Sequence, residues 1–195
     1  MTTAAAHPPI EDSRDRASAA LGMAIFIGSW AMAFAVLFLS FLILRHKQPA
    51  WPPAGVTLPS LPLALAGTAV LLGSSYALHR SVSALRRGDR YLSWWNVGLV
   101  GGLVFAVLQT WLWADLWSVG STTFTGGIYE SLFYGLTWFH GLHVLCGLVA
   151  LAAARIGAAT GRYGHERRSF LVNAAVFWHF VDVVWIVLFF CFFVP

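Results

Sequence analysis

The sequence predicts an all-α integral membrane protein, a bundle of five transmembrane helices. Hydrophobic residues make up 58% of the chain and charged residues only 10%, and the mean hydropathy is +0.72. A soluble domain carries about 25% charged residues, so this composition indicates a chain that sits in a bilayer. Five apolar runs are each long enough to cross a bilayer as a helix: residues 21–44, 61–78, 91–117, 128–154 and 170–194.

The remaining segments are a polar tail and short connections. Residues 1–20 lack a basic start followed by a short apolar core, so we expect a cytoplasmic tail and no cleavable signal peptide. No linker is long enough to separate domains, and residues 21–195 are therefore expected to form one five-helix domain. The connections are a proline-rich loop that cannot be helical, two basic loops and a Gly/Thr turn, at residues 48–59, 80–90, 155–168 and 118–127.

Small and aromatic residues within the runs indicate how the helices pack. The second run is rich in glycine and serine, which let helix backbones approach closely. The third has tryptophans near both ends, as expected of side chains at the two membrane interfaces. In the fourth run we expect three glycines to allow close approach, Gly135, Gly141 and Gly147.

The distribution of basic residues predicts the orientation. Placing the N-terminus inside and the C-terminus outside puts all but two of the twelve Lys and Arg residues, Arg45 and Lys47, on the cytoplasmic side. That bias is typical of multi-pass proteins, in which basic loops stay inside. It also accounts for the net charge of +4, so the charge does not indicate a nucleic-acid partner.

Ionisable residues at bilayer depth mark the candidate site. His140 and His143 lie near the middle of the fourth run, and His179 and Asp182 near the middle of the fifth. The two helices are antiparallel, so a rise of about 1.5 Å per residue places these side chains at similar depths. We expect one interhelical polar cluster in which Asp182 accepts a hydrogen bond from a histidine.

This cluster admits a structural and a functional interpretation. It could be a packing clamp between two helices, or a heme, metal or proton site, and the clamp is the simpler interpretation because a metal needs three or four convergent ligands. Glu130 lies near the outer end of the fourth run, where we expect it to be solvated or paired at the interface.

The same residues carry a resemblance to a known family. Residues 137–144 read TWFHGLHV, with Gly147 one turn further on, and residues 178–185 read WHFVDVVW. With these two motifs the chain resembles the cytochrome c oxidase subunit III family of the heme–copper terminal oxidases, in its five-span bacterial form. Further matches run from about residue 21 to the C-terminus and include Leu21-Gly22-Met23, Phe26, Ser29, Arg45, Trp51-Pro52-Pro53, Gly55, Pro59, Ser74-Ser75 and Gln109.

The chain departs from the family pattern at three carboxylates and one small residue. Trp30 follows Ser29 where the family has a glutamate that reacts with carbodiimides, and Leu112 and Val172 stand at two further glutamate positions. Trp138 replaces a small residue of the histidine motif. An apolar residue in place of a membrane carboxylate removes a desolvation cost, so the scaffold is expected to be unaffected.

The resemblance implies a non-catalytic subunit of an aerobic electron-transport complex. Such a chain holds no heme or copper, which belong to partner subunits, and takes no part in the chemistry itself. It packs on subunit I, with subunit II nearby, binds phospholipid and protects the oxidase during turnover in the bacterial inner membrane. The family also has a seven-span form, so its two further helices are either absent here or supplied by subunit I.

Other functions remain open at this stage. An accessory subunit of a quinol oxidase or of a nitric oxide reductase would share the fold. A b-type heme membrane protein would use His140, His143 and His179 as axial ligands. A small transporter is disfavoured, because the sequence shows one contiguous polar cluster and no paired, broken helices.

The predicted orientation can be tested by labelling single cysteines with a membrane-impermeant thiol reagent. Cysteines placed at Arg86 and Arg162 should react only from the cytoplasmic side, and those at Ser121 and Pro195 only from outside. Reaction of the Ser121→Cys variant from the cytoplasmic side alone would reverse the assignment.

Overall fold

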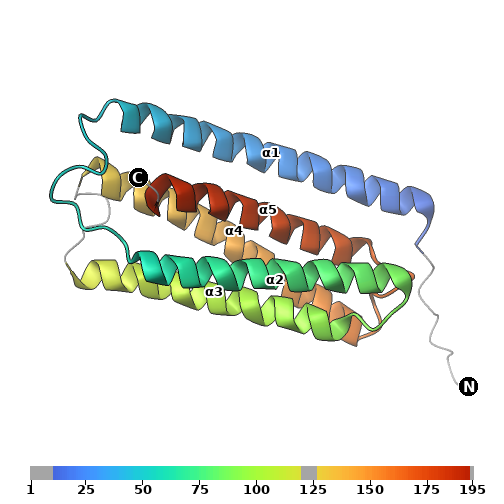
Figure 1. Ribbon diagram of the computed structural model, residues 1–195. Helices are drawn as coiled ribbons and strands as arrows, with labels where there is room; N and C mark the ends of the chain where they lie inside the picture. The colour runs from blue at the N-terminus through green and yellow to red at the C-terminus, as the bar shows by residue number, and fades with distance from the viewer. Residues whose placement is uncertain (1–10, 120–126, 194–195) are drawn as a thin grey trace, which may run out of the picture.

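Five helices of alternating direction make up the protein (Figure 1). The computed structural model describes residues 11–119 and 127–193, so Ser121 and Pro195 lie outside the described residues. All five helices are long and apolar enough to cross a membrane, and the described part contains no strand, which confirms the predicted fold class. They are α1 Ser13–His46, α2 Leu61–Arg87, α3 Leu92–Ser118, α4 Ile128–Ala159 and α5 Ser169–Phe193.

The helices extend beyond the apolar runs. Helix α1 begins at Ser13, inside the segment predicted as a tail, and the Asp12 side chain accepts a hydrogen bond from the Arg14 amide at its start. That contact and the Ser13 hydroxyl, which has the larger effect, lower the pKa of the Asp12 carboxyl. Helices α2 and α4 likewise continue into the two basic segments predicted as loops. Hydropathy detects only the part of a helix that lies in hydrocarbon. The helical backbone hydrogen bonds continue past the membrane surface, so each helix can be longer than its apolar run.

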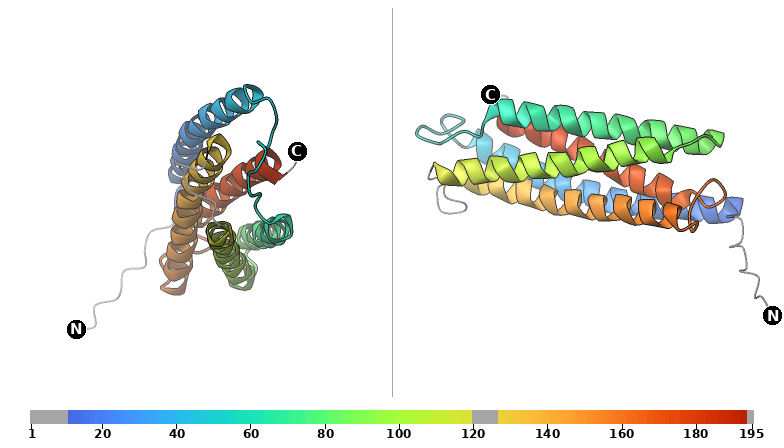
Figure 2. Two further views of the ribbon diagram at one scale, coloured as in Figure 1. Left: turned by 90° about the vertical axis from the view of Figure 1, so that its left-hand side faces the viewer. Right: turned by 90° about the horizontal axis from the view of Figure 1, so that it is seen from below.

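Helix α5 lies at the centre of the arrangement. It packs against α1, α2 and α4, while α3 joins α2 to α4 (Figure 2). Helix α1 stands on the outside of the bundle and buries only Phe34 and Phe41. Because successive helices are antiparallel, the start of α1 and the end of α5 lie at opposite ends (Figure 1).

The Trp178 indole joins three helices. It projects from α5, is fully buried, and lies between Gly102 of α3 and Gly147 of α4. A Cβ atom added to Gly102 would lie 2.7 Å from Trp178 Cη2, and one added to Gly147 would lie 2.9 Å from Trp178 Cε3. Only glycine leaves room for the ring on both sides, which confirms the expected role of Gly147.

Close approach also joins α2 to α3. The Ser74 hydroxyl donates to the Gly98 carbonyl at 2.6 Å, and a Cβ atom on Gly101 would lie 2.9 Å from Ser74 Cβ. Ser74 of the second run therefore packs closely as predicted, whereas an added Cβ on Gly73 would meet no atom within 4 Å. Gly135 does not: its face of α4 is exposed, with no atom within 4 Å of an added Cβ, so the close approach predicted there is wrong.

The chain before α1 is tied to the segment before α5. Glu11 Oε2 accepts hydrogen bonds from the Arg168 and Ser169 amides, at 3.1 and 3.2 Å. These amides lie at the start of α5, where an intrahelical partner is missing and the helix dipole favours a negative charge. Glu11 thus caps a helix distant in sequence and holds two connections together at one end of the bundle.

Gly102→Val should destabilise the protein, because its side chain would displace the Trp178 ring, and overpacking of this kind costs about 1–3 kcal/mol. The matched control is Gly135→Val, which makes the same change on an open face. Thermal unfolding in detergent, followed by circular dichroism, should show a lower midpoint for Gly102→Val only. Equal midpoints for the two variants would contradict the packing described here.

Candidate functional site

The four predicted site residues lie in three different environments. His140, His143 and Asp182 are buried, with exposed fractions of 1%, 4% and 3%, and His179 is half-buried. The predicted hydrogen bond from a histidine to Asp182 is not formed, since neither Asp182 oxygen has a hydrogen-bond partner among the described residues. His143 faces α1, His179 and Asp182 face α2, and His140 borders a pocket between α3 and α4.

His143 faces helix α1. Its Nδ1 donates a hydrogen bond to the Phe139 carbonyl at 2.7 Å, one turn earlier in α4. Its ring lies 4.3 Å from the Trp30 ring, edge to face, and 5.1 Å from the Phe34 ring. His143 therefore acts as an aromatic contact between α4 and α1.

Trp30 stands where the resemblance implies a carboxylate. Besides His143, its ring contacts Phe26 and Phe139, so it links α1 to α4 through rings alone. Leu112 and Val172, at the two other positions, are buried and half-buried. All three replacements sit among apolar neighbours or at a helix end, and none leaves an unpaired charge in the membrane.

His179 and Asp182 face helix α2. Ser75 Oγ lies 2.5 Å from His179 Nδ1, and Asp182 Oδ2 lies 3.7 Å from the same nitrogen. A serine, histidine and aspartate thus gather here, but both partners approach one ring nitrogen, so the imidazole cannot pass a proton from one to the other as in a hydrolase triad. The group ties α5 to α2 instead.

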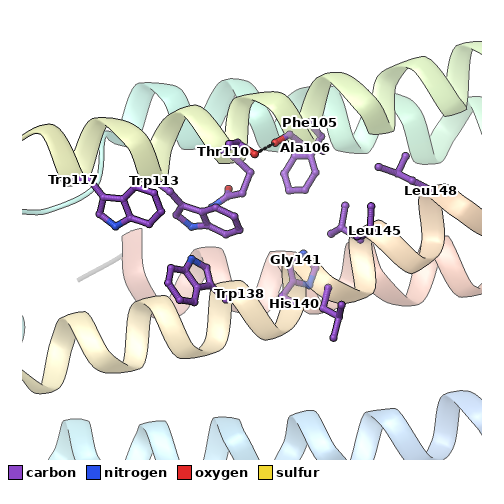
Figure 3. A pocket seen from close by; sticks show the side chains of 13 residues that line it. Phe105, Ala106, Thr110, Trp113, Trp117, Trp138, His140, Gly141, Leu145 and Leu148 are labelled. Carbon is purple, nitrogen blue, oxygen red and sulfur yellow. Dashed lines mark hydrogen bonds between the residues drawn. The ribbon is translucent and has the colours of Figure 1, made fainter. Parts of the chain in front are cut away.

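His140 borders a pocket between α3 and α4. Its ring stacks on Trp185 at 5.7 Å between centroids, and neither ring nitrogen has a hydrogen-bond partner in the described part of the chain. The pocket measures about 460 Å³, and its walls include Gln109, Trp113 and Trp138 (Figure 3). Trp185, by contrast, is satisfied, because its Nε1 donates to Thr68 Oγ1 at 3.0 Å.

Glu130 and Arg45 lie at the other candidate positions. Glu130 is in the first turn of α4, where a carboxylate is favoured by the helix dipole, and is 9% exposed, so it is buried rather than solvated. Its Oε2 has no hydrogen-bond partner among the described residues. The Arg45 guanidinium lies 5.8 Å above the Trp51 ring, a cation–π contact that fixes the start of the proline-rich loop on α1.

The arrangement does not bring metal ligands together. In residues 11–119 and 127–193, no group of three or more His, Cys, Asp or Glu side chains is placed to hold a metal ion. The three histidines proposed as axial heme ligands face α1, α2 and the pocket, and only His140 borders the pocket. That heme and copper belong to partner subunits stays a prediction.

Several polar partners in the bundle were not predicted from the sequence. Ser75 was noted as a small residue and as a family match but not as a polar partner, yet its hydroxyl contacts His179. Thr68 was not named, although its hydroxyl accepts a hydrogen bond from Trp185, and Trp113 was expected only as an interface tryptophan, although it lines the pocket. Polar side chains within apolar runs were the available signal, since each such group in hydrocarbon needs a partner.

Together, these features define a multi-pass membrane protein of five helices, with polar side chains that mainly join one helix to the next. The family model for cytochrome c oxidase subunit III matches residues 13–194. The chain belongs to this family, whose members are components of the heme–copper oxidases of respiratory chains.

Curated relatives agree over most of the chain. Cytochrome c oxidase subunit 3 of Synechocystis is 36% identical over 173 residues, covering 86% of this chain and 72% of the relative. The protein of that name from Thermostichus vulcanus is 32% identical, over 87% of this chain and 83% of its own length. A probable cytochrome c oxidase subunit 3 from Nocardia farcinica is 34% identical, covering 87% and 84%. The resemblance carried by the two motifs is therefore confirmed.

Removing the hydroxyl in Ser75→Ala should weaken the contact between α2 and α5. The His179 nitrogen loses a hydrogen-bond partner, at a cost of about 0.5–1.5 kcal/mol in stability. Ser29→Ala is the control, because that hydroxyl bonds only to the Ile25 carbonyl of its own helix. Chemical unfolding in detergent should separate the two variants, and identical free energies of unfolding would show that the Ser75 contact contributes nothing.

Proposed function

We propose that this chain is the non-catalytic subunit III of a bacterial heme–copper oxidase. In this proposal it lies in the inner membrane with its N-terminus in the cytoplasm, packs on subunit I beside subunit II, and holds phospholipid at the junction. Its role is to prolong activity over many turnovers. Family membership over residues 13–194, and the names of the cyanobacterial and actinobacterial relatives, support this assignment.

The uncovered face of α1 is the observation that carries the proposal. Apolar side chains along its length are exposed, with fractions of 63% at Ile25 and 73% at Met32. The helix is held mainly by α5 and by the Trp30–His143 contact, so most of its circumference has no protein neighbour. In a membrane, such a face packs against lipid chains or against the helices of a larger subunit.

The contacts of the polar residues support a role in preserving the activity of the oxidase rather than in its chemistry. Asp182, His179 and Ser75 join α5 to α2, and His143 joins α4 to α1, so these groups already serve the bundle. A rigid bundle presenting an apolar face can fill the space beside a catalytic subunit and retain lipid there. Without the bundle and its lipid, the neighbouring subunit should change structure more readily during turnover.

Oxidase prepared without this chain should keep its hemes and its initial rate of oxygen consumption. Its activity should then decay several-fold faster over successive turnovers, and faster still after phospholipid is removed. The measurement is oxygen consumption against time for complexes with and without the chain. Immediate and complete loss of activity, with the hemes still in place, would mean that the chain takes part in the chemistry.

Adding variant chains back to oxidase that lacks this chain tests which surface docks on the neighbouring subunit. The double variant Ile25→Trp/Met32→Trp changes the shape of the uncovered α1 face while keeping it apolar, and it should restore durability poorly. Val149→Trp makes a similar change on the exposed face of α4, where Val149 is 62% exposed, and should restore durability fully. Full restoration by the double variant would place the docking surface elsewhere.

A further inference from the structure

The pocket between α3 and α4 contains polar atoms that the protein leaves unpaired. Gln109 Nε2, Trp113 Nε1 and both nitrogens of His140 are buried without a hydrogen-bond partner among the described residues. Gln109 is 8% exposed and His140 1%. Trp113 extends from α3 and His140 from α4 toward the same space (Figure 3). A buried donor without a partner costs about 1–3 kcal/mol, so three of them in one pocket indicate a missing partner.

The chemistry of these atoms specifies that partner. The unpaired Gln109 Nε2 carries two N–H donors and the indole one, and a neutral imidazole adds one donor and one acceptor. Donors outnumber acceptors, so the complementary group is an oxygen acceptor such as a carbonyl. The pocket is lined by no Asp, Glu, Lys or Arg, which favours a neutral molecule over an ionic one.

The walls of the pocket specify the rest of the molecule. Aromatic rings line it at Phe105, Trp113, Trp117 and Trp138, and offer faces and edges on which a flat ring can stack. Leu142 and Leu145 also line it, and both are more than half exposed, so the pocket opens toward the outer surface of the bundle. A volume of about 460 Å³ fits one ring with a short apolar chain.

The depth of the polar atoms distinguishes this pocket from a phospholipid site. At about 1.5 Å per residue, His140 lies about 18 Å from the start of α4, and Gln109 about 13 Å from the end of α3. The hydrocarbon core is about 30 Å thick, so these atoms lie near its middle. The ester carbonyls and head groups of phospholipids lie at its edges and do not reach them.

We propose that this pocket binds a flat, neutral, carbonyl-bearing molecule of the quinone class. On binding, the side chains that cover the nitrogens of Gln109, Trp113 and His140 shift, and the carbonyl oxygens accept hydrogen bonds from them. The ring lies among the aromatic walls, and the apolar chain leaves past Leu142 and Leu145. The proposal concerns binding alone and includes no electron transfer. It depends only on the pocket, and holds whichever oxidase the chain accompanies.

Binding is tested with the full-length chain in phosphatidylcholine nanodiscs, using decylubiquinone as the probe. Quenching of tryptophan fluorescence should contain a saturable component, from which the dissociation constant is taken. Dodecylbenzene, with a ring and a chain but no carbonyl, should not compete for the site. Quenching that rises only linearly with decylubiquinone, or equal competition by dodecylbenzene, would overturn the proposal.

Two variants and one control test the donors. Gln109→Leu and Trp113→Phe each remove one N–H and should weaken binding about five- to tenfold, the effect of losing one hydrogen bond. Thr110→Val is the control, because Thr110 lines the same pocket while its hydroxyl is already bonded to the Ala106 carbonyl at 2.8 Å. Unchanged affinity in both donor variants, or an equal loss in the control, would contradict the assignment.

Photolabelling provides a second measurement that needs no substitution. An aryl-azide derivative of the same quinone, illuminated with the native chain, should label peptides that contain residues 109–117 and 138–145. Unlabelled quinone should suppress this labelling. Label confined to α1 or α2 would place the binding site elsewhere and overturn the proposal, even if a donor variant failed to fold.

Discussion

Insertion of the Trp178 ring between Gly102 and Gly147 is the contact on which the bundle depends. Lipid chains are as apolar as the helix surfaces, so burial from water does not drive the helices together, and close packing must hold them. Trp178 provides that packing for α3, α4 and α5 at once. Two other indoles add directional bonds, since Trp95 donates to the Leu151 carbonyl and Trp185 to Thr68.

Hydropathy was sufficient to predict the elements but not their contacts. The five spans follow from the length of each apolar run, which is why the fold class is confirmed while helix ends such as Ser13 and Arg87 differ. Depth along each helix also followed from residue counting. The rotation of each helix about its axis could not be predicted in this way, because an all-apolar helix has no polar face that would indicate which side is buried. Gly135 and Gly147 therefore looked equivalent in sequence, although one is open and the other holds a ring.

The candidate site shows the same limit. His140 and His143 are three residues apart and share a helix, yet one borders a pocket and the other contacts Trp30. Asp182 was expected to accept a hydrogen bond from a histidine, and the imidazole beside it is that of His179 on its own helix, at 3.7 Å. The local pair could be anticipated from i,i+3 spacing, whereas Ser75, more than a hundred residues away in sequence, could not.

Unpaired polar atoms and uncovered apolar surface carry different information in a membrane. The bare face of α1 costs little in lipid, so it is compatible with lipid, with another subunit, or with both. The unpaired donors of Gln109, Trp113 and His140 carry a cost in hydrocarbon that lipid chains cannot relieve. Trp30 illustrates the contrast, because an apolar ring there packs against His143 with no charge to satisfy. Apolar residues stand at three positions where the family resemblance implies carboxylates, whereas three buried donors remain around one space, which fits the proposed partner that enters from the bilayer.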